Sequence, residues 1–163
     1  VPENKMGGIS TLEEKSIGAI SKSGSKTISG VLSYGEIPRK KGLFFVDNWM
    51  SQNSIFSGFA AAGAHILLHQ LGGAGYTNVD LFTPSLGITS PVLWITANRN
   101  TYNMARDSID YYSGKVIEGN ISLNEAGDEL LRVIIDIASG TMAKEEALNH
   151  PVVSQFYLEE SVF

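Results

Sequence analysis

The sequence contains no cysteine, no long hydrophobic run and no concentration of positive charge. Without cysteine, the chain has no disulfides, thiolate zinc sites, iron–sulfur ligands or thiol nucleophiles. No apolar stretch approaches the roughly 18 residues that span a bilayer, so no membrane partner is expected. The 12 Lys and Arg are scattered and are outnumbered by 17 Asp and Glu, which gives a net charge of -5. This balance excludes the electrostatic footprint of a nucleic-acid-binding protein.

The length and the first residues bear on domain organisation. The chain has 163 residues, of which 43% are hydrophobic, and this suits one globular domain of roughly 150 residues. The start lacks the basic residues and apolar stretch of a signal peptide, which predicts a cytoplasmic protein. The sequence begins at Val1 and reaches a capped helix within a few residues, which is typical of an excised domain as readily as of a complete protein.

Short apolar runs alternate with helical segments along the first two thirds of the sequence. The runs at 43–46, 66–68 and 92–96 are bounded by polar or turn residues, which is the pattern of strands buried on both faces of a sheet. The residue spacing predicts helices over 54–63 and 101–112. The expected fold class is α/β, with a mostly parallel, Rossmann-like sheet, helices on both faces and a single domain.

Two capping boxes mark the starts of further helices. In Thr11-Leu-Glu-Glu14 and Ser122-Leu-Asn-Glu125, a hydroxyl and a carboxylate three residues later satisfy backbone N–H groups at the helix start. They predict a helix over about 12–22 and a second one that ends at Gly140. The second helix carries one apolar stripe, expected to face the core, made of Leu130, Leu131, Ile134, Ile135 and Ala138. We further expect a helical turn over 144–149 and an edge strand over 152–163.

Polar residues and glycines follow each predicted strand. In an open parallel sheet, ligands bind beyond the carboxyl ends of the strands. One concave substrate-binding region is therefore expected, lined by Asp47, Asn48, His69, Gln70, Gly72, Gly73 and Asn98, the last followed by Arg99. The glycines either let backbone N–H groups approach an anion such as a carboxylate or phosphate, or form a plain turn. Their spacing is not that of a P-loop or a dinucleotide-binding fingerprint.

Histidines and aspartates suggest two further kinds of site. His65 and His69 form no HExxH pattern and have no third ligand nearby, so no metal site is predicted, and His69 is expected to line the crevice. Asp107 and Asp110 lie three apart on the predicted helix. They are either paired carboxylates for acid–base chemistry or part of a solvated face. These patterns assign no catalytic residue.

Four stretches of the sequence carry a family resemblance. Residues 4–18, NKMGGISTLEEKSIG, closely resemble the motif NKxGGLTTLEEKSLG of the altronate dehydratase (altronate hydrolase)/D-galactarate dehydratase family. Residues 31–42 are similar to its VLKYGExPxKKGL, and residues 57–64 are similar to its TGxAAAGA. The segment from Asn98 to Gly114 resembles its TxNxxTYxxMxxDIDxxAG. The resemblance spans nearly the whole chain.

The resemblance implies a C-terminal domain that follows a catalytic domain, so residues 1–163 are expected to be a domain excised from a longer chain. The implied reaction removes water from a sugar acid such as altronate or galactarate and gives a 3-deoxy-2-keto acid, with a divalent metal, iron or manganese, in the full-length protein. A base removes the proton α to a carboxylate, and the β-hydroxyl departs. Because this chain shows no metal-ligand cluster, the isolated domain is expected to be inactive and to hold no cofactor. Its expected partners are the upstream catalytic domain, the small sugar-acid substrate and further copies in a homo-oligomer.

The chain departs from the family pattern at three places: after the second predicted strand, in the loop from Tyr76 to Ser90, and at Asp110-Tyr-Tyr-Ser-Gly114. Where the family has TTGRGT after the second strand, Gly73 stands in place of the arginine, the natural bidentate partner of a carboxylate. The residues Tyr111-Tyr112-Ser113 stand in place of an Asn-Ala ending. Two alternatives stay open: a divergent lyase acting on another hydroxy acid such as sulfolactate, and a non-catalytic binding or oligomerisation module with exposed aromatics at Trp49 and at Tyr111 and Tyr112.

Overall fold

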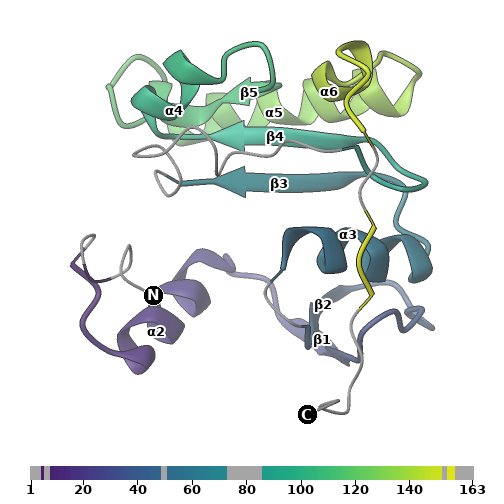
Figure 1. Cartoon of the computed structure of the whole chain (residues 1–163). Helices are drawn as coiled ribbons and strands as arrows, with labels where there is room; N and C mark the ends of the chain where they lie inside the picture. Colours follow the sequence, from purple (N-terminus) through teal and green to yellow (C-terminus); the bar gives the residue numbers. More distant parts are fainter. Residues whose placement is uncertain (1–4, 6–7, 49–50, 73–85, 152–153, 157–163) are drawn as a thin grey trace.

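The computed structural model describes residues 5, 8–48, 51–72, 86–151 and 154–156 (Figure 1). The described strands pair in parallel and form two sheets. One sheet holds β1 (Ile28–Leu32) and β2 (Leu43–Val46), and the other holds β3 (Leu67–Leu71), β4 (Val92–Thr96) and β5 (Tyr111–Tyr112) in the order β3-β4-β5. The α/β class and the single small domain are confirmed. The pairing of β2 differs from the prediction: β2 pairs with β1 and does not join the sheet of the later strands.

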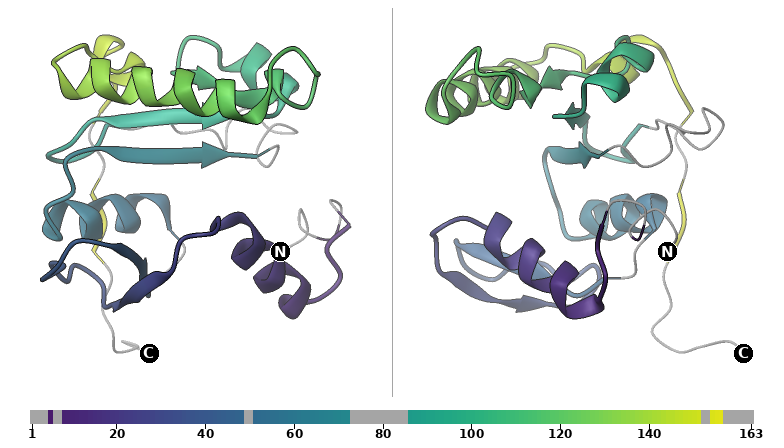
Figure 2. Two further views of the ribbon diagram at one scale, coloured as in Figure 1. Left: turned by 180° about the vertical axis from the view of Figure 1, so that it is seen from behind. Right: turned by 90° about the vertical axis from the view of Figure 1, so that its left-hand side faces the viewer.

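Helices lie on both faces of the three-stranded sheet, as predicted, but they do not cover β3 fully. Leu68 is 52% exposed, so the prediction that this strand is buried on both faces is wrong. On one face, α3 (Gln52–Ala61) packs against the side of the sheet that carries Trp94, and α3 also lies between the two sheets (Figure 1). On the other face, Leu93 packs with Ile137 of α5 (Leu123–Ala138), which crosses in front of the sheet when seen from behind (Figure 2). All five residues of β4 are buried because helices cover both of its sides.

The strand predicted at 43–46 forms as β2, but it is not buried on both faces. Leu43 and Phe45 are 42% and 59% exposed, whereas Phe44 and Val46 are half-buried. The physical reason is that α3 lies on one side of the two-stranded sheet and leaves the other side open (Figure 1). An apolar run therefore predicted the strand correctly and its environment wrongly.

Both predicted capped helices form. In α2 (Leu12–Lys22), the Thr11 hydroxyl accepts a hydrogen bond from the Glu14 N–H at 3.1 Å. In α5, the Ser122 hydroxyl accepts from the Glu125 N–H at 3.2 Å, and the Glu125 carboxylate accepts from the Ser122 N–H at 2.7 Å. These contacts join residues three apart, so the local sequence alone was enough to place both helix starts.

The core-facing side of α5 differs from the predicted stripe. Ala126 and Ile137 are buried, while Leu131 and Ile135 are 53% and 52% exposed. The contacting residues repeat every three to four positions, as expected for a helix face, but this face is displaced by about one residue from the predicted one. Gly140, at φ +106°, ends the helix as predicted.

The helix predicted over 101–112 is mostly absent. The helix α4 (Arg99–Met104) ends early, and the chain then extends into β5. The Asp110 carboxylate causes this change, because it accepts hydrogen bonds from the backbone N–H groups of Trp94 at 2.8 Å and Lys144 at 2.9 Å. Asp110 therefore shares no helix face with Asp107. Both alternatives given for Asp110, a paired carboxylate for acid–base chemistry and a solvated residue, are wrong.

The described residues after α5 form one short helix, α6, and a segment without regular secondary structure. Lys144 begins α6 (Lys144–Ala147), which confirms the expected helical turn. Residues 154–156 form no strand, and the rest of the edge strand expected over 152–163 lies largely outside the described residues. Within the described ranges, no helix has the length and apolar character needed to cross a membrane.

Candidate functional site

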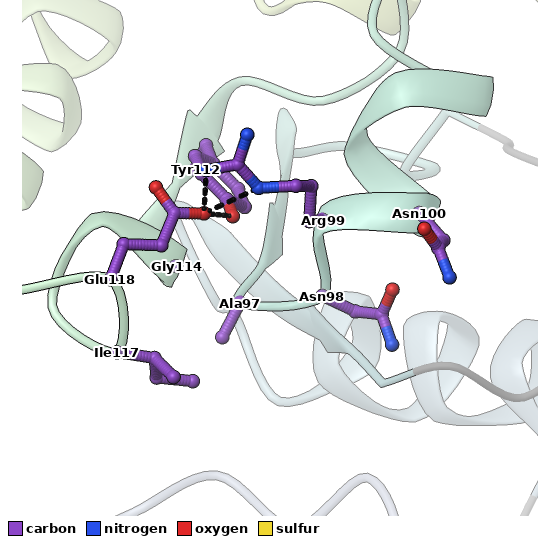
Figure 3. A pocket seen from close by; sticks show the side chains of 8 residues that line it. All are labelled: Ala97, Asn98, Arg99, Asn100, Tyr112, Gly114, Ile117 and Glu118. Atoms are coloured by element: carbon purple, nitrogen blue, oxygen red, sulfur yellow. Dashed lines mark hydrogen bonds and ion pairs between the residues drawn. The ribbon is translucent and has the colours of Figure 1, made fainter.

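A pocket of about 370 Å³ lies at the carboxyl end of β4, which is where ligands bind in open α/β sheets (Figure 3). One wall follows β4 and the other follows β5, so two neighbouring parallel strands deliver their next residues to the same place. The lining residues are Ala97, Asn98, Arg99, Asn100, Tyr112, Gly114, Ile117 and Glu118. The pocket thus combines two amides, a guanidinium, a phenol and a carboxylate.

Arg99, Glu118 and Tyr112 form a hydrogen-bonded trio on one side of this pocket (Figure 3). Glu118 Oε1 accepts from Arg99 Nε at 2.9 Å, lies 2.7 Å from the nearer terminal nitrogen of Arg99, and also accepts from the Tyr112 hydroxyl. The Tyr112 ring stacks on Tyr102 of α4 with ring centroids 4.6 Å apart. The trio therefore fixes the position of a guanidinium whose side chain is still 64% exposed.

The charges of the trio shift the pKa of each member. The hydrogen bonds from the Tyr112 hydroxyl and from Arg99 lower the pKa of Glu118, so its carboxylate stays ionised. The same bond to Glu118 raises the pKa of Tyr112, so the phenol stays protonated and donates. The hydrogen bond and charge of Glu118 also raise the pKa of Arg99. Neither Glu118 nor Tyr112 is thus poised to act as a base.

A chain of polar contacts holds Asn98 at the rim of the pocket. Its side-chain Oδ1 accepts from the Thr101 N–H at 3.1 Å, which caps α4, and its own N–H donates to the Thr96 hydroxyl at 3.1 Å. Thr96 and Thr101 in turn donate to the carbonyl oxygens of Leu71 and Gly72, both at 3.0 Å. These bonds tie the end of β3 to the end of β4 and fix the backbone from which Arg99 projects.

Comparison with known proteins identifies the family of the chain. The sequence matches the family described as D-galactarate/altronate dehydratase, C-terminal, over residues 1–160. This chain belongs to the D-galactarate/altronate dehydratase family. It is the C-terminal domain of that family, as the resemblance of its motifs implies.

Several curated relatives of this dehydratase-family domain are lyases. It is 32% identical to the altronate dehydratase of Bacillus subtilis over 145 residues, covering 89% of this chain and 27% of the relative. It is 35% identical to the (2R)-sulfolactate sulfo-lyase subunit beta of Chromohalobacter salexigens over 150 residues, covering 90% of this chain and 36% of that relative. It is 30% identical to the galactarate dehydratase (L-threo-forming) of Escherichia coli over 139 residues, covering 85% of this chain and 25% of that relative. The chain thus spans about a quarter to a third of the length of these relatives.

The structure separates the predicted site residues of this dehydratase-family domain into different places. Asn98 lines the pocket, and the nearby Gly72 carbonyl is bonded to α4. Gln70 is exposed on β3 and does not line the pocket. Asp47 and Asn48 follow β2 and therefore end the other sheet. Gly73 lies outside the described residues.

His69 is half-buried beside aromatic residues of α3 and β4 and is not among the pocket residues. Its ring centroid lies 4.5 Å from that of Trp94 and 5.5 Å from that of Phe56, which meets it edge-on. Burial lowers the pKa of His69 to about 4, because the imidazolium would lose its hydration there. A neutral ring enclosed by two aromatic side chains is a packing residue.

Four of the polar and charged pocket residues were missing from the predicted binding set: Arg99, Asn100, Tyr112 and Glu118. The sequence did indicate Arg99, because this residue directly follows Asn98 after the third predicted strand. It gave no indication of Tyr112, because the helical spacing of residues 101–112 predicts a helix where the structure has β5. Nor is the pair Tyr111 and Tyr112 an exposed aromatic patch: Tyr111 is 6% exposed, its hydroxyl donates to the Ala126 carbonyl at 3.1 Å, and burial raises its pKa to about 12.

The described residues do not form a metal centre. Among them, no group of three or more His, Asp or Glu side chains is arranged to hold a metal ion. The nearest approach to a cluster is the fully buried Glu145, which is paired with His150. Burial raises the pKa of the nearby Asp110, and the charge of Glu145 adds to this increase. Since the Asp110 oxygens already accept two backbone N–H groups, this group of residues is structural.

Proposed function

We propose that this chain is the C-terminal domain of a hydro-lyase that removes water from a sugar acid such as altronate or galactarate and yields a 3-deoxy-2-keto acid. Three relatives named as dehydratases of these acids, in Bacillus subtilis and Escherichia coli, support the reaction class. In this proposal the enzyme is a cytoplasmic homo-oligomer with no nucleic acid or membrane partner. The chain supplies one wall of the substrate site.

The residues that break bonds belong, in this proposal, to the rest of the enzyme. The reaction needs a base for the proton α to the carboxylate and an acid for the departing β-hydroxyl. The carboxylates of Asp110, Glu118 and Glu145 are each held in hydrogen bonds, and the half-buried His69 ring packs against Trp94. The described residues do not fit the iron or manganese ion of such an enzyme. We therefore place the catalytic groups and any divalent metal outside this domain, which is inactive alone.

The observation that carries the proposed role is the position of Arg99. Its guanidinium lies at the carboxyl edge of the parallel sheet and has five N–H donors, of which Glu118 engages two at one edge. The outer edge faces solvent and has the planar geometry that pairs with a carboxylate. The Asn98 and Asn100 side chains, which lie away from the trio in Figure 3, add amide groups suited to sugar hydroxyls.

Product formation tests this proposal. The full-length enzyme, loaded with Fe(II) or Mn(II), is given galactarate, altronate and sulfolactate, and 2-keto acid formation is measured in parallel with sulfite release. We expect keto acid from galactarate or altronate and no sulfite. The chain alone is the control and should give neither product. An absence of elimination from all three substrates would refute the lyase assignment.

A second candidate is a lyase that releases sulfite from sulfolactate. One observation favours it: the 35% identity to a sulfolactate sulfo-lyase subunit covers 90% of this chain. The substrate carries a carboxylate and a sulfonate, and the pocket would serve either anion through Arg99. In the same assay, sulfite release without keto acid formation from the sugar acids would select this candidate.

A further inference from the structure

We propose that the open face of the two-stranded sheet docks onto the catalytic part of the same enzyme, which meets it with a surface that is apolar at its centre and acidic at one edge. This inference rests on the proposed function only in taking the chain to be one part of a larger enzyme. The docking face is defined by Ile28 and Val31 of β1 and Leu43 and Phe45 of β2.

The strand register brings the four side chains together. Ile28 pairs with Leu43 and Val31 pairs with Phe45. Partners in a parallel pair project to the same side, and residues two apart along a strand do so as well. Leu43 and Phe45 therefore share a side, and the irregularity between Ile28 and Gly30 keeps Ile28 and Val31 on it too. The result is a continuous apolar surface on one side of the sheet.

The docking face is uncovered in the described chain. Its four side chains are 47%, 67%, 42% and 59% exposed, in sequence order. The alternating residues Leu32, Phe44 and Val46 are half-buried, which is expected for side chains on the opposite side of the strands. Parallel sheets are normally covered on both faces, and two strands alone are too few to be stable in water. This sheet therefore needs a cover that the described residues do not supply.

The whole segment that contains the two-stranded sheet lacks buried residues. Among residues 8–48, which form α2, β1 and β2, none is buried. Leu12, Ile17 and Ile20 of α2 are 78%, 66% and 71% exposed, and the helix has no buried residue. In Figure 1, α2 lies beside the two-stranded sheet and away from the three-stranded one. About a quarter of the chain thus has ordered secondary structure and no core of its own.

The length of the relatives identifies the occupant. This chain corresponds to 27% of one altronate dehydratase and 25% of a galactarate dehydratase, and its family match is to the C-terminal part of such proteins. Most of such an enzyme therefore lies outside this chain and must contact it if the two parts share a substrate site. An uncovered apolar face on the segment 8–48 offers that contact.

The charges around the docking face specify the partner further. Lys26 precedes β1, and Arg39, Lys40 and Lys41 precede β2, so the parallel strands place these cations at one end of the sheet. With Lys22 they make up five of the 12 Lys and Arg in a chain whose net charge is -5. A complementary surface carries carboxylates opposite this end.

Thiol labelling tests the docking face, and the absence of cysteine from this chain makes the test clean. Val31→Cys and Phe45→Cys are each introduced into the full-length enzyme, with Asn124→Cys, at an exposed position of α5, as the matched control. Maleimide labelling of the corresponding peptides is followed by mass spectrometry. We expect labelling at positions 31 and 45 to be at least about tenfold slower than at 124, because a docked face excludes the reagent.

A second set of variants tests the charge requirement and the identity of the occupant. Lys40→Glu with Lys41→Glu, added to Val31→Cys, should restore rapid labelling by repelling the acidic edge. Equal labelling rates at 31, 45 and 124 would overturn the proposal. Protection that disappears when the enzyme is diluted from an oligomer to a monomer would also overturn it, because the occupant would then be a second copy. None of these readouts needs substrate, so an enzyme inactive on sugar acids could still confirm the docking face.

Discussion

Acidification should destabilise this domain through His69, whose ring is packed between Phe56 and Trp94. The folded-state pKa of His69 is about 4, whereas an unfolded histidine has a pKa of about 6.5. Between these values the unfolded chain binds a proton that the folded chain does not. Stability therefore rises with pH through this window and falls as the solution becomes more acidic.

The size of the effect follows from the two pKa values. At pH 7 both states are mostly neutral, and the contribution of His69 to the pH dependence is about 0.2 kcal/mol. At pH 5 the unfolded histidine is mostly protonated and the folded one is still neutral, which costs about 2 kcal/mol of stability. Near pH 4 the cost approaches about 3 kcal/mol, and it levels off below the folded pKa.

Urea denaturation between pH 4.5 and 7.5 measures this contribution. The comparison is between the wild type, His69→Leu and the control His65→Leu, since His65 is exposed. The stability difference between wild type and His69→Leu should change by about 2 kcal/mol from pH 7 to pH 5. The His65→Leu variant controls for the introduction of a leucine in place of a histidine. A flat difference for His69→Leu would show that the ring is hydrated and would refute its burial against Phe56 and Trp94.

Three further substitutions test the helices and the contact between Glu145 and His150. Ser122→Ala removes one half of the capping box of α5 and should cost about 1 kcal/mol in the free energy of unfolding, measured by urea denaturation. His150→Ala removes the ring nitrogen that is bonded to the carboxylate of Glu145, which is 0% exposed, and should cost roughly 1–3 kcal/mol because a buried acceptor loses its partner; no measurable loss would contradict the burial. Gly127→Ala, in the middle of α5 with open space around the added methyl group, should raise the midpoint of thermal unfolding by stabilising the helix by about 0.5–1 kcal/mol.

Local sequence patterns predicted the features that depend on neighbours in the chain. Thr11 and Ser122 marked the starts of α2 and α5 because a capping hydroxyl acts within three residues. The apolar run at 92–96 predicted the central strand because both of its faces are covered. The family resemblance of residues 4–18 was also carried by the sequence and is confirmed by the family match.

Contacts between distant residues decided what the sequence did not reveal. The helical spacing of residues 101–112 is overridden by Asp110, whose carboxylate binds the N–H groups of Trp94 and Lys144, 16 and 34 positions away. That change creates β5 and brings Tyr112 beside Arg99. The second wall of the pocket could not be predicted for this reason, although Asn98 on the first wall could be.

Steady-state kinetics of the full-length enzyme with its sugar-acid substrate test the central claim, that the Arg99 pocket is the substrate-binding wall supplied by this domain. Arg99→Ala is compared with Arg132→Ala, which removes an exposed arginine on α5 outside the pocket. Loss of a guanidinium–carboxylate contact made equally in the ground and transition states should raise KM by roughly tenfold or more and leave kcat nearly unchanged. Arg132→Ala should behave as the wild type. An Arg99→Ala enzyme with unaltered KM would contradict the account.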